Sequence, residues 1–148
     1  MNIRQLGPRA PVTIPGDATL SDAARLMDGA NVGCLLVMDG ERLAGIVTDR
    51  DIVVRGVARR VPAHARIDSV MTTDVVSVDA SVDAHDAYRV LETHAVRRLP
   101  VMDGDEVVGM LSVDDLIVAL AADLERLVHP IVGEVVFGHH PAQVPAVR

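Results

Sequence analysis

The chain has no lysine or tryptophan, and only one tyrosine, one phenylalanine and one cysteine among its 148 residues. Proteins that hold single-stranded nucleic acids stack the bases on aromatic side chains, which this composition cannot supply. The 14 basic residues, all arginine, are outnumbered by 21 acidic ones, and the net charge of −7 disfavours contact with a phosphate backbone. We therefore expect no nucleic-acid partner.

Other absences bear on where the protein works. The single cysteine, Cys34, cannot form an internal disulfide, as expected in a reducing cytoplasm. Residues 1–8 lack the apolar run of a signal peptide. The longest apolar runs, residues 34–38 and 116–122, are far too short to cross a membrane. The sequence thus predicts a cytoplasmic protein with no membrane partner.

Aliphatic residues, by contrast, are abundant. Hydrophobic residues make up 49% of the chain, and valine is the commonest of them. The core must therefore be aliphatic, and β-branched valine suits strands. A chain of this length can bury a core without help from a metal or a disulfide.

The two halves of the chain repeat one another. A shift of 64 residues brings Val37 onto Val101 and aligns the halves without a gap. Two copies are too few for a solenoid, so a closed pseudo-symmetric pair is expected. The aligned segments are 37–40 with 101–104, 45–48 with 109–112, and Asp51 with Asp115.

Each repeat has the same predicted order of elements. Short strands are expected at residues 12–14 and 75–78, each followed by a helix. The first helix has an apolar face from Leu20 to Met27, with Thr19 as its N-cap. Asp-Gly pairs at residues 39–40 and 103–104 predict hairpins. Second helices begin near Asp49 and Val113, which gives an α/β (α+β) fold of two β-α-β-β-α repeats in a pseudo-two-fold pair.

The expected boundaries follow from these elements. Residues 1–62 form the first domain with an irregular N-terminal arm, and residues 63–128 form the linker and the second domain. The arginine- and proline-containing segment 58–70 is the expected connection between the repeats. Residues 129–148, rich in glycine and proline, are expected to be a tail with a short strand or helix followed by disorder.

The repeated pattern resembles the cystathionine-β-synthase (CBS) domain pair, also called a Bateman module. The motif that carries the resemblance is Gly, two hydrophobic residues, Thr or Ser, any two residues, Asp and a hydrophobic residue. It occurs at residues 45–52 and 109–116. The segments 69–72 (Ser-Val-Met-Thr) and 96–101 (Val-Arg-Arg-Leu-Pro-Val) match further family elements, and the resemblance covers about residues 6–128.

The resemblance implies a disc-like module with two clefts, each able to accept AMP, ADP, ATP or S-adenosylmethionine as a regulatory ligand, with no required cofactor. In the family, the Thr/Ser-x-x-Asp of one repeat faces adenine-contacting segments of the other. The first cleft would combine Thr48 and Asp51 with residues 79–81, which include Ser81, and with Val96, Arg97 and Arg98. The second would combine Ser112 and Asp115 with residues 15–17, which include Asp17, and with Val32, Gly33 and Cys34.

The chemistry of the repeated motif fits two roles. An ionised aspartate only accepts hydrogen bonds, so one carboxylate can take both hydroxyl protons of a ribose. The start of a helix favours a phosphate. Helix capping by Thr48 with Asp51, and by Ser112 with Asp115, explains the same residues at about 1 kcal/mol each. The two roles are compatible.

The predicted clefts differ in charge. Arg97 and Arg98 make the first cleft the better predicted phosphate site, whereas Gly33 and Cys34 take the matching positions in the second. The alternative for the two arginines is a surface ion pair with Asp103, Asp105 or Glu106.

No catalytic constellation is visible in the sequence. There is no nucleophile–base pair, no Gly-rich phosphate loop and no metal-ligand spacing around His139 and His140, so neither an enzyme nor a metal site is expected. Cys34 begins an apolar strand and is expected to be buried. The sequence predicts a regulatory module that senses an adenine nucleotide and acts on an unknown protein, with a ligand-free interaction scaffold as the alternative.

A homodimer is also expected, since CBS pairs typically dimerise through their helices. The candidate interface consists of the apolar helix faces near Leu26, Met27, Val90 and Leu91.

Overall fold

The repeat in the sequence becomes two three-stranded sheets of the same topology in a computed structural model. The structure describes the backbone of residues 1–137 and the side chains of residues 1–128. In each sheet the first strand runs parallel to the second and the second antiparallel to the third. This arrangement confirms the predicted α/β class and the two β-α-β-β-α repeats.

The first half begins with a short helix that precedes its sheet. Its elements are α1 (Ile3–Leu6), β1 (Thr13–Pro15), α2 (Leu20–Ala30), β2 (Cys34–Asp39), β3 (Arg42–Thr48), α3 (Asp49–Asp51), the π-helical η1 (Ile52–Gly56) and the 3-10 turn η2 (Val57–Arg59). The second half contains the 3-10 turn η3 (Ile67–Ser69), β4 (Val78–Asp79), α4 (Ala84–His94), β5 (Arg98–Asp103), β6 (Glu106–Ser112) and α5 (Val113–Phe137).

Local chemistry fixes where these elements begin and turn. Helix α2 starts at Thr19, whose hydroxyl accepts a hydrogen bond from the Asp22 N–H while the Asp22 carboxylate accepts one from the Thr19 N–H. The hairpins turn at Gly40 and Gly104, both at a φ of 61° in the first of two turn positions. Only glycine adopts this conformation freely, which explains the repeated Asp-Gly pairs.

Each half has its own aliphatic core. The first core gathers residues from its sheet and α2, and the second gathers the equivalent residues from its sheet, α4 and the start of α5. The buried residues of the first are Ile14, Leu20, Ala23, Met27, Leu35, Val37, Val47, Ile67 and Val70. Those of the second are Ile3, Val78, Ala80, Ala87, Leu91, Leu99, Val101, Leu111 and Leu116.

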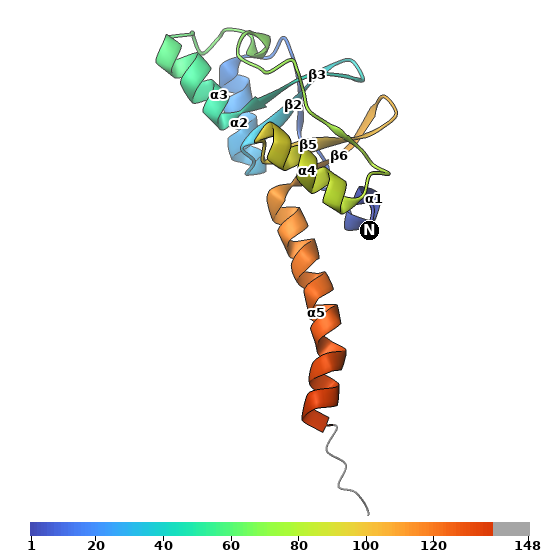
Figure 1. Cartoon of the computed structure of the whole chain (residues 1–148). Coiled ribbons are helices and arrows are strands. Elements are labelled where there is room, and N and C mark those ends of the chain that lie inside the picture. Colours follow the sequence, from blue (N-terminus) through green and yellow to red (C-terminus); the bar gives the residue numbers. More distant parts are fainter. Residues whose placement is uncertain (138–148) are drawn as a thin grey trace, which may run out of the picture.

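The N-terminal arm is not irregular, and it packs on the second half. Residues Ile3–Leu6 form α1, and Ile3 is fully buried in the second core. The Met1 ammonium lies 2.9 Å from an Asp83 carboxylate oxygen, and the Arg4 guanidinium donates to Asp103 at 2.6 Å. In Figure 1, α1 lies beside α4 and the start of α5. The expectation of an irregular arm was wrong, because residues Ile3–Leu6 form a helix whose Ile3 side chain is buried about 80 residues away along the chain, in the second core.

Part of the connection between the repeats is buried in the first core. Ile67 and Val70, inside the expected linker 58–70, are buried in the first core. The strand predicted at residues 75–78 is shorter, since only Val78–Asp79 pair with β5. The segment before it instead pairs with the first half, because Thr72 exchanges two backbone hydrogen bonds with Ile46.

Equivalent glycines let these crossing segments approach the sheets. Arg9 exchanges backbone hydrogen bonds with Met110, as Thr72 does with Ile46. A Cβ atom added at Gly109 would lie 2.7 Å from the Pro8 Cβ, and one added at Gly45 would lie 2.9 Å from the Thr72 carbonyl oxygen. The glycine of the repeated motif is therefore needed for close backbone approach.

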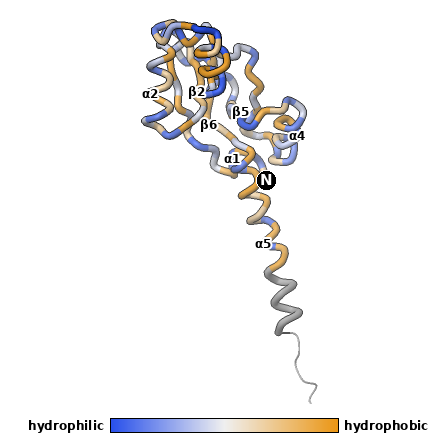
Figure 2. The backbone as a smooth tube through the Cα atoms, turned by 90° about the vertical axis from the view of Figure 1, so that its left-hand side faces the viewer, coloured by the Kyte–Doolittle hydropathy of each residue, from blue (hydrophilic) through white to orange (hydrophobic). Residues whose placement is uncertain are grey.

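Helix α5 leaves the body of the molecule and extends well beyond it (Figure 1). It includes residues 129–137 of the predicted tail as helix, while the remainder of that prediction, residues 138–148, lies outside the described residues. Apolar residues continue along α5 after it leaves the body (Figure 2). Within the described part of the chain, no helix combines the length and apolar character that crossing a membrane requires.

The helix faces expected to form a dimer interface are not free. Met27 and Leu91 are buried in their own cores, and Leu26 and Val90 are partly buried against them. These residues were assigned to an interface because an amphipathic helix looks the same whether its apolar face meets a sheet or a partner. Most exposed large apolar side chains lie instead on η1, η2 and α5: Val53, Val54, Val57, Ile117, Val118, Leu120, Leu124, Leu127 and Val128.

Candidate functional site

Both repeated motifs form helix caps of the expected kind. The Thr48 N–H and hydroxyl donate to Asp51 Oδ2 at 2.9 and 3.0 Å, and the Asp51 N–H donates back to Thr48 Oγ1 at 3.1 Å. Ser112 and Asp115 repeat this pattern with 2.9, 2.6 and 3.2 Å. In each pair the cap occupies Oδ2 and leaves Oδ1 for another partner.

A cleft opens beside the second motif. It has a volume of about 190 Å³, and residues from both halves line it. Its apolar walls include Pro11, Val12, Val32 and Met110, and its polar lining includes Asp115 at the start of α5. The complete lining is Arg9, Ala10, Pro11, Val12, Asn31, Val32, Gly33, Cys34, Arg98, Met110, Ser112, Asp114 and Asp115.

Most residues predicted for the second cleft do meet there. Val32, Gly33 and Cys34 line the cleft together with Ser112 and Asp115. The Asp17 side chain does not contribute to this lining and is exposed on the turn after β1. The neighbouring Gly16 carbonyl accepts a hydrogen bond from the Asp68 N–H, so that turn faces the connection between the repeats.

Arg98, which the sequence analysis assigned to the first cleft, lines the second. It lines the cleft with Ser112 because the two residues lie directly opposite each other on β5 and β6, which places their side chains on one face of the sheet. Among the described residues, no ion pair joins Arg97 or Arg98 to the acidic residues suggested as alternatives. Asp103 pairs with Arg4 instead.

The remaining residues predicted for the first cleft have other partners. Val96 packs against the second core. The backbone carbonyl of the exposed Arg97 accepts a hydrogen bond from the Val113 N–H. The Ser81 N–H and hydroxyl donate to Asp79 Oδ1 at 2.8 and 2.6 Å. These bonds, with a smaller contribution from Arg4, lower the pKa of the Asp79 carboxyl.

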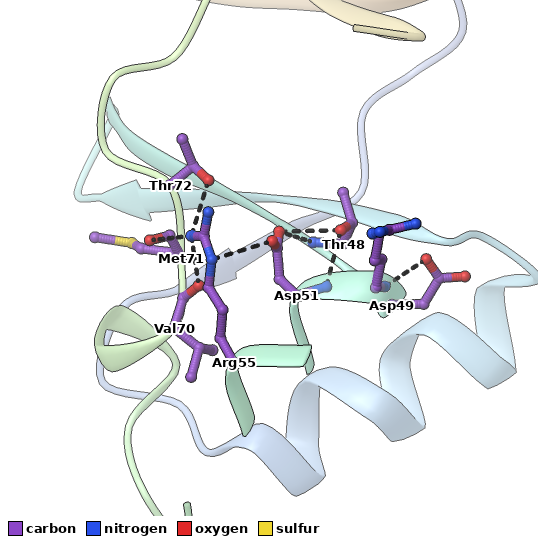
Figure 3. A network of polar contacts seen from close by, with 8 residues as sticks. Thr48, Asp49, Asp51, Arg55, Val70, Met71 and Thr72 are labelled. Atoms are coloured by element: carbon purple, nitrogen blue, oxygen red, sulfur yellow. Dashed lines mark hydrogen bonds and ion pairs between the residues drawn. The ribbon is translucent and has the colours of Figure 1, made fainter. Parts of the chain in front are cut away.

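Sequence analysis did not identify two arginines that lie beside the motif aspartates. The Arg9 guanidinium lies 3.4 Å from Asp115 Oδ1, and the Arg55 guanidinium lies 3.6 Å from Asp51 Oδ1. Figure 3 shows Arg55 between Asp51 and the segment Val70, Met71 and Thr72. The spacing of Arg55 four residues after Asp51 was a usable signal, since such pairs meet on a helix. Arg9 gave no signal because its contact depends on the fold of the arm.

Cys34 is buried at the start of β2 and lines the cleft. Burial raises the pKa of the Cys34 thiol to about 11, with Arg98 opposing the increase and Asp51 and Asp49 adding to it. The thiol is therefore neutral at physiological pH, as expected for a buried small hydrophobe. In the described residues no three His, Cys, Asp or Glu side chains gather as a metal site would need.

These features define which chemical groups the cleft can accommodate. Apolar walls can enclose a flat ring, the Asp115 Oδ1 atom can accept hydrogen bonds from hydroxyl groups, and two arginines can balance negative charge. The cleft is therefore lined by residues of both pseudo-symmetric repeats.

Comparison with known proteins agrees with this class. The CBS domain family matches residues 3–57 and 67–122, so the chain belongs to the CBS-domain family and contains a tandem pair. CBS-domain pairs are in general regulatory modules.

Individual relatives resemble the chain in sequence or in fold. The chain is 35% identical over 106 residues to the CBS domain-containing protein YhcV of Bacillus subtilis, covering 72% of this chain and 76% of that protein. A solved CBS-domain protein from Burkholderia ambifaria is 30% identical, with a TM-score of 0.75 and coverage of 83% and 96%. A CBS-domain protein of Pyrobaculum aerophilum, solved with AMP, is 24% identical, with a TM-score of 0.72 and coverage of 82% and 99%.

Proposed function

We propose that this chain is a non-catalytic regulatory module that binds an adenine nucleotide, or a related adenosyl compound such as S-adenosylmethionine, in the cleft at Ser112 and Asp115. The observation that carries the proposal is the Asp115 carboxylate, which presents one oxygen to a cleft with apolar walls. A ribose offers two adjacent hydroxyl donors to such an acceptor. The AMP-bound Pyrobaculum aerophilum protein has the same fold, which is consistent with this choice.

The proposal requires Arg9 to move. A second cavity of about 330 Å³ lies between α1 and α5, and it shares Arg9 and Asp115 with the cleft. The cleft alone is smaller than the roughly 300 Å³ at which ligand pockets usually begin. Displacing the Arg9–Asp115 ion pair joins the two spaces and frees the guanidinium for a phosphate.

Charge supports a nucleotide with few phosphates. Two arginines, Arg9 and Arg98, and two aspartates, Asp114 and Asp115, line the cleft, so the charges of its side chains balance. The start of α5 adds partial positive charge. A singly phosphorylated ligand such as AMP is therefore favoured over ATP, whose longer chain of charges meets no further arginine in this lining.

Thermal unfolding with AMP tests the proposal. A ligand at 100 times its Kd stabilises a protein by about 2.7 kcal/mol, which corresponds to roughly 5–15 °C in Tm for a chain of this size. Asp115→Asn should remove most of this shift because the carboxamide keeps one acceptor oxygen, which the cap uses, and replaces the other with an NH2 donor that cannot accept from ribose hydroxyls. Asp17→Asn, a change at an exposed acid outside the cleft, is the matched control and should retain the shift.

A ligand-free interaction scaffold is the second candidate, and one observation favours it. The caps occupy Oδ2 of each aspartate and an arginine lies near each Oδ1, so both carboxylates have partners without any ligand. Absence of a Tm shift with AMP, ADP, ATP and S-adenosylmethionine would support the scaffold and contradict nucleotide sensing.

The chain is also proposed to act as a homodimer on a separate protein. The support is the row of exposed apolar residues on α5, where Ile117, Leu120, Leu124 and Leu127 are each more than half exposed. Apolar surface of this extent favours association. The dimer is the simplest way to cover it.

A further inference from the structure

The two motif aspartates have the same caps but different counterions. In each, Oδ2 belongs to the cap and Oδ1 faces a guanidinium, that of Arg55 for Asp51 and that of Arg9 for Asp115. The two carboxylates are similarly shielded, with side-chain exposures of 17% and 22%. Any difference in their availability to a ligand therefore depends on how firmly each arginine is held.

Arg55 is held on several sides. Its Nη1 atom donates to the carbonyl oxygens of Val70 and Met71 at 3.2 and 3.4 Å, and to the Thr72 hydroxyl at 3.1 Å. Figure 3 shows the guanidinium bridging this segment and Asp51. Since arginine stays charged at all accessible pH values, Asp51 keeps this counterion throughout. A ribose would have to break the whole arrangement to reach Oδ1.

Arg9 is held much more loosely. Its side chain is 81% exposed, against 41% for Arg55. Within the described residues, the ion pair with Asp115 is the one polar contact of the Arg9 guanidinium. An exposed pair of this kind contributes little stability, so a ligand can displace it.

Comparison of the two repeats explains why an arginine of the motif helix lies beside Asp51 but not beside Asp115. A shift of 64 residues places Arg55 on Ala119. Ala119 lines the 330 Å³ cavity beside Asp115, so the second half has open space at the position where the first half has a guanidinium. The small side chain leaves the second site accessible.

We infer that Arg55 closes the Thr48/Asp51 cleft, and that the chain binds one ligand, at Asp115, although it contains two copies of the binding motif. This inference rests on the proposed function. It assigns Arg55 the role of a built-in occupant that sets the number of ligands per chain.

Replacing Arg55 by the residue of the other repeat tests this role. Calorimetric titration of the full chain with AMP should give one site per chain in the wild type and two in Arg55→Ala. Adding Asp51→Asn to Arg55→Ala should return the number to one, and adding Asp115→Asn instead should leave only the new site. Arg55→Met, which keeps the aliphatic stem, serves the same purpose if Arg55→Ala does not fold.

The outcomes separate this inference from the proposed function. One site in both the wild type and the Arg55 variants would contradict closure of the Thr48/Asp51 cleft by Arg55, while leaving nucleotide binding in place. Two sites in the wild type would overturn it as well. No binding to the wild type but one site in Arg55→Ala would support closure of the Thr48/Asp51 cleft by Arg55 and contradict nucleotide sensing by the natural chain. No binding to any variant would overturn both.

Discussion

Burial disfavours the ionised form of the Cys34 thiol. The thiol is buried at the start of β2, and its pKa is raised from 9.0 to about 11 mainly by burial. The thiolate is the nucleophile in alkylation, so iodoacetamide should react with the folded protein at pH 8 far more slowly than with the urea-unfolded chain. Mass spectrometry over time gives both rates.

The same thiol predicts a pH dependence of stability. A pKa raised in the folded state means that, between about pH 9 and 11, the unfolded chain loses a proton that the folded chain retains. The free energy of unfolding should therefore fall across this window and be unaffected by this group below pH 9. Urea unfolding of wild type and Cys34→Ala checks this, since the variant lacks the Cys34 contribution to the fall. Equal slopes in the two proteins would contradict a raised pKa.

At the scale of elements, the two first helices of the repeats end differently. Helix α2 ends at Asn31 with a φ of 53°, and α4 ends at the equivalent Ala95 with a φ of 52°. Asparagine tolerates the left-handed region, whereas alanine is strained there by about 1 kcal/mol. Ala95 is exposed, so no packing opposes a larger side chain.

Exchanging these two caps should move stability in opposite directions. Ala95→Asn should raise the free energy of unfolding by about 0.5–1 kcal/mol, and Asn31→Ala should lower it by a similar amount. Urea denaturation at neutral pH measures both. A loss of stability in Ala95→Asn would show that the backbone strain is not what limits α4.

Elements set by local chemistry were predictable from the sequence. The caps at Thr19, Thr48 and Ser112 and the hairpins at Gly40 and Gly104 depend on residues within a few positions of one another. The pairing of the Val32–Gly33–Cys34 segment with Ser112 followed from the resemblance.

The rest depended on contacts between distant residues. Ile3 has partners in the second core that no local pattern reveals. Arg98 was not expected in the second cleft because its side-chain direction depends on its register opposite Ser112. Arg55 and Arg9 acquired roles only when the crossing segments were positioned against β3 and β6.

At the scale of the whole molecule, the apolar surface of α5 predicts an assembly. Leu120 and Leu124 are 62% and 55% exposed, on successive turns of a helix that extends away from the body. Sedimentation equilibrium should give a dimer for the wild type and a monomer for Leu120→Glu combined with Leu124→Glu, because each change places a charge in an apolar contact.

A change on the other exposed apolar surface is the control. Val57 is 69% exposed on η2, in the first half. Val57→Glu should remain dimeric if α5 forms the contact. A dimer unaffected by the α5 changes, or lost in Val57→Glu instead, would contradict this interface.

A crystal structure of the wild-type chain grown with AMP tests the central claim most directly. The ribose hydroxyl groups should lie within hydrogen-bond distance of Asp115 Oδ1, with Arg9 turned away from it and Arg55 still on Asp51. A nucleotide whose ribose meets Asp51, or one that lies away from both aspartates, would contradict the account.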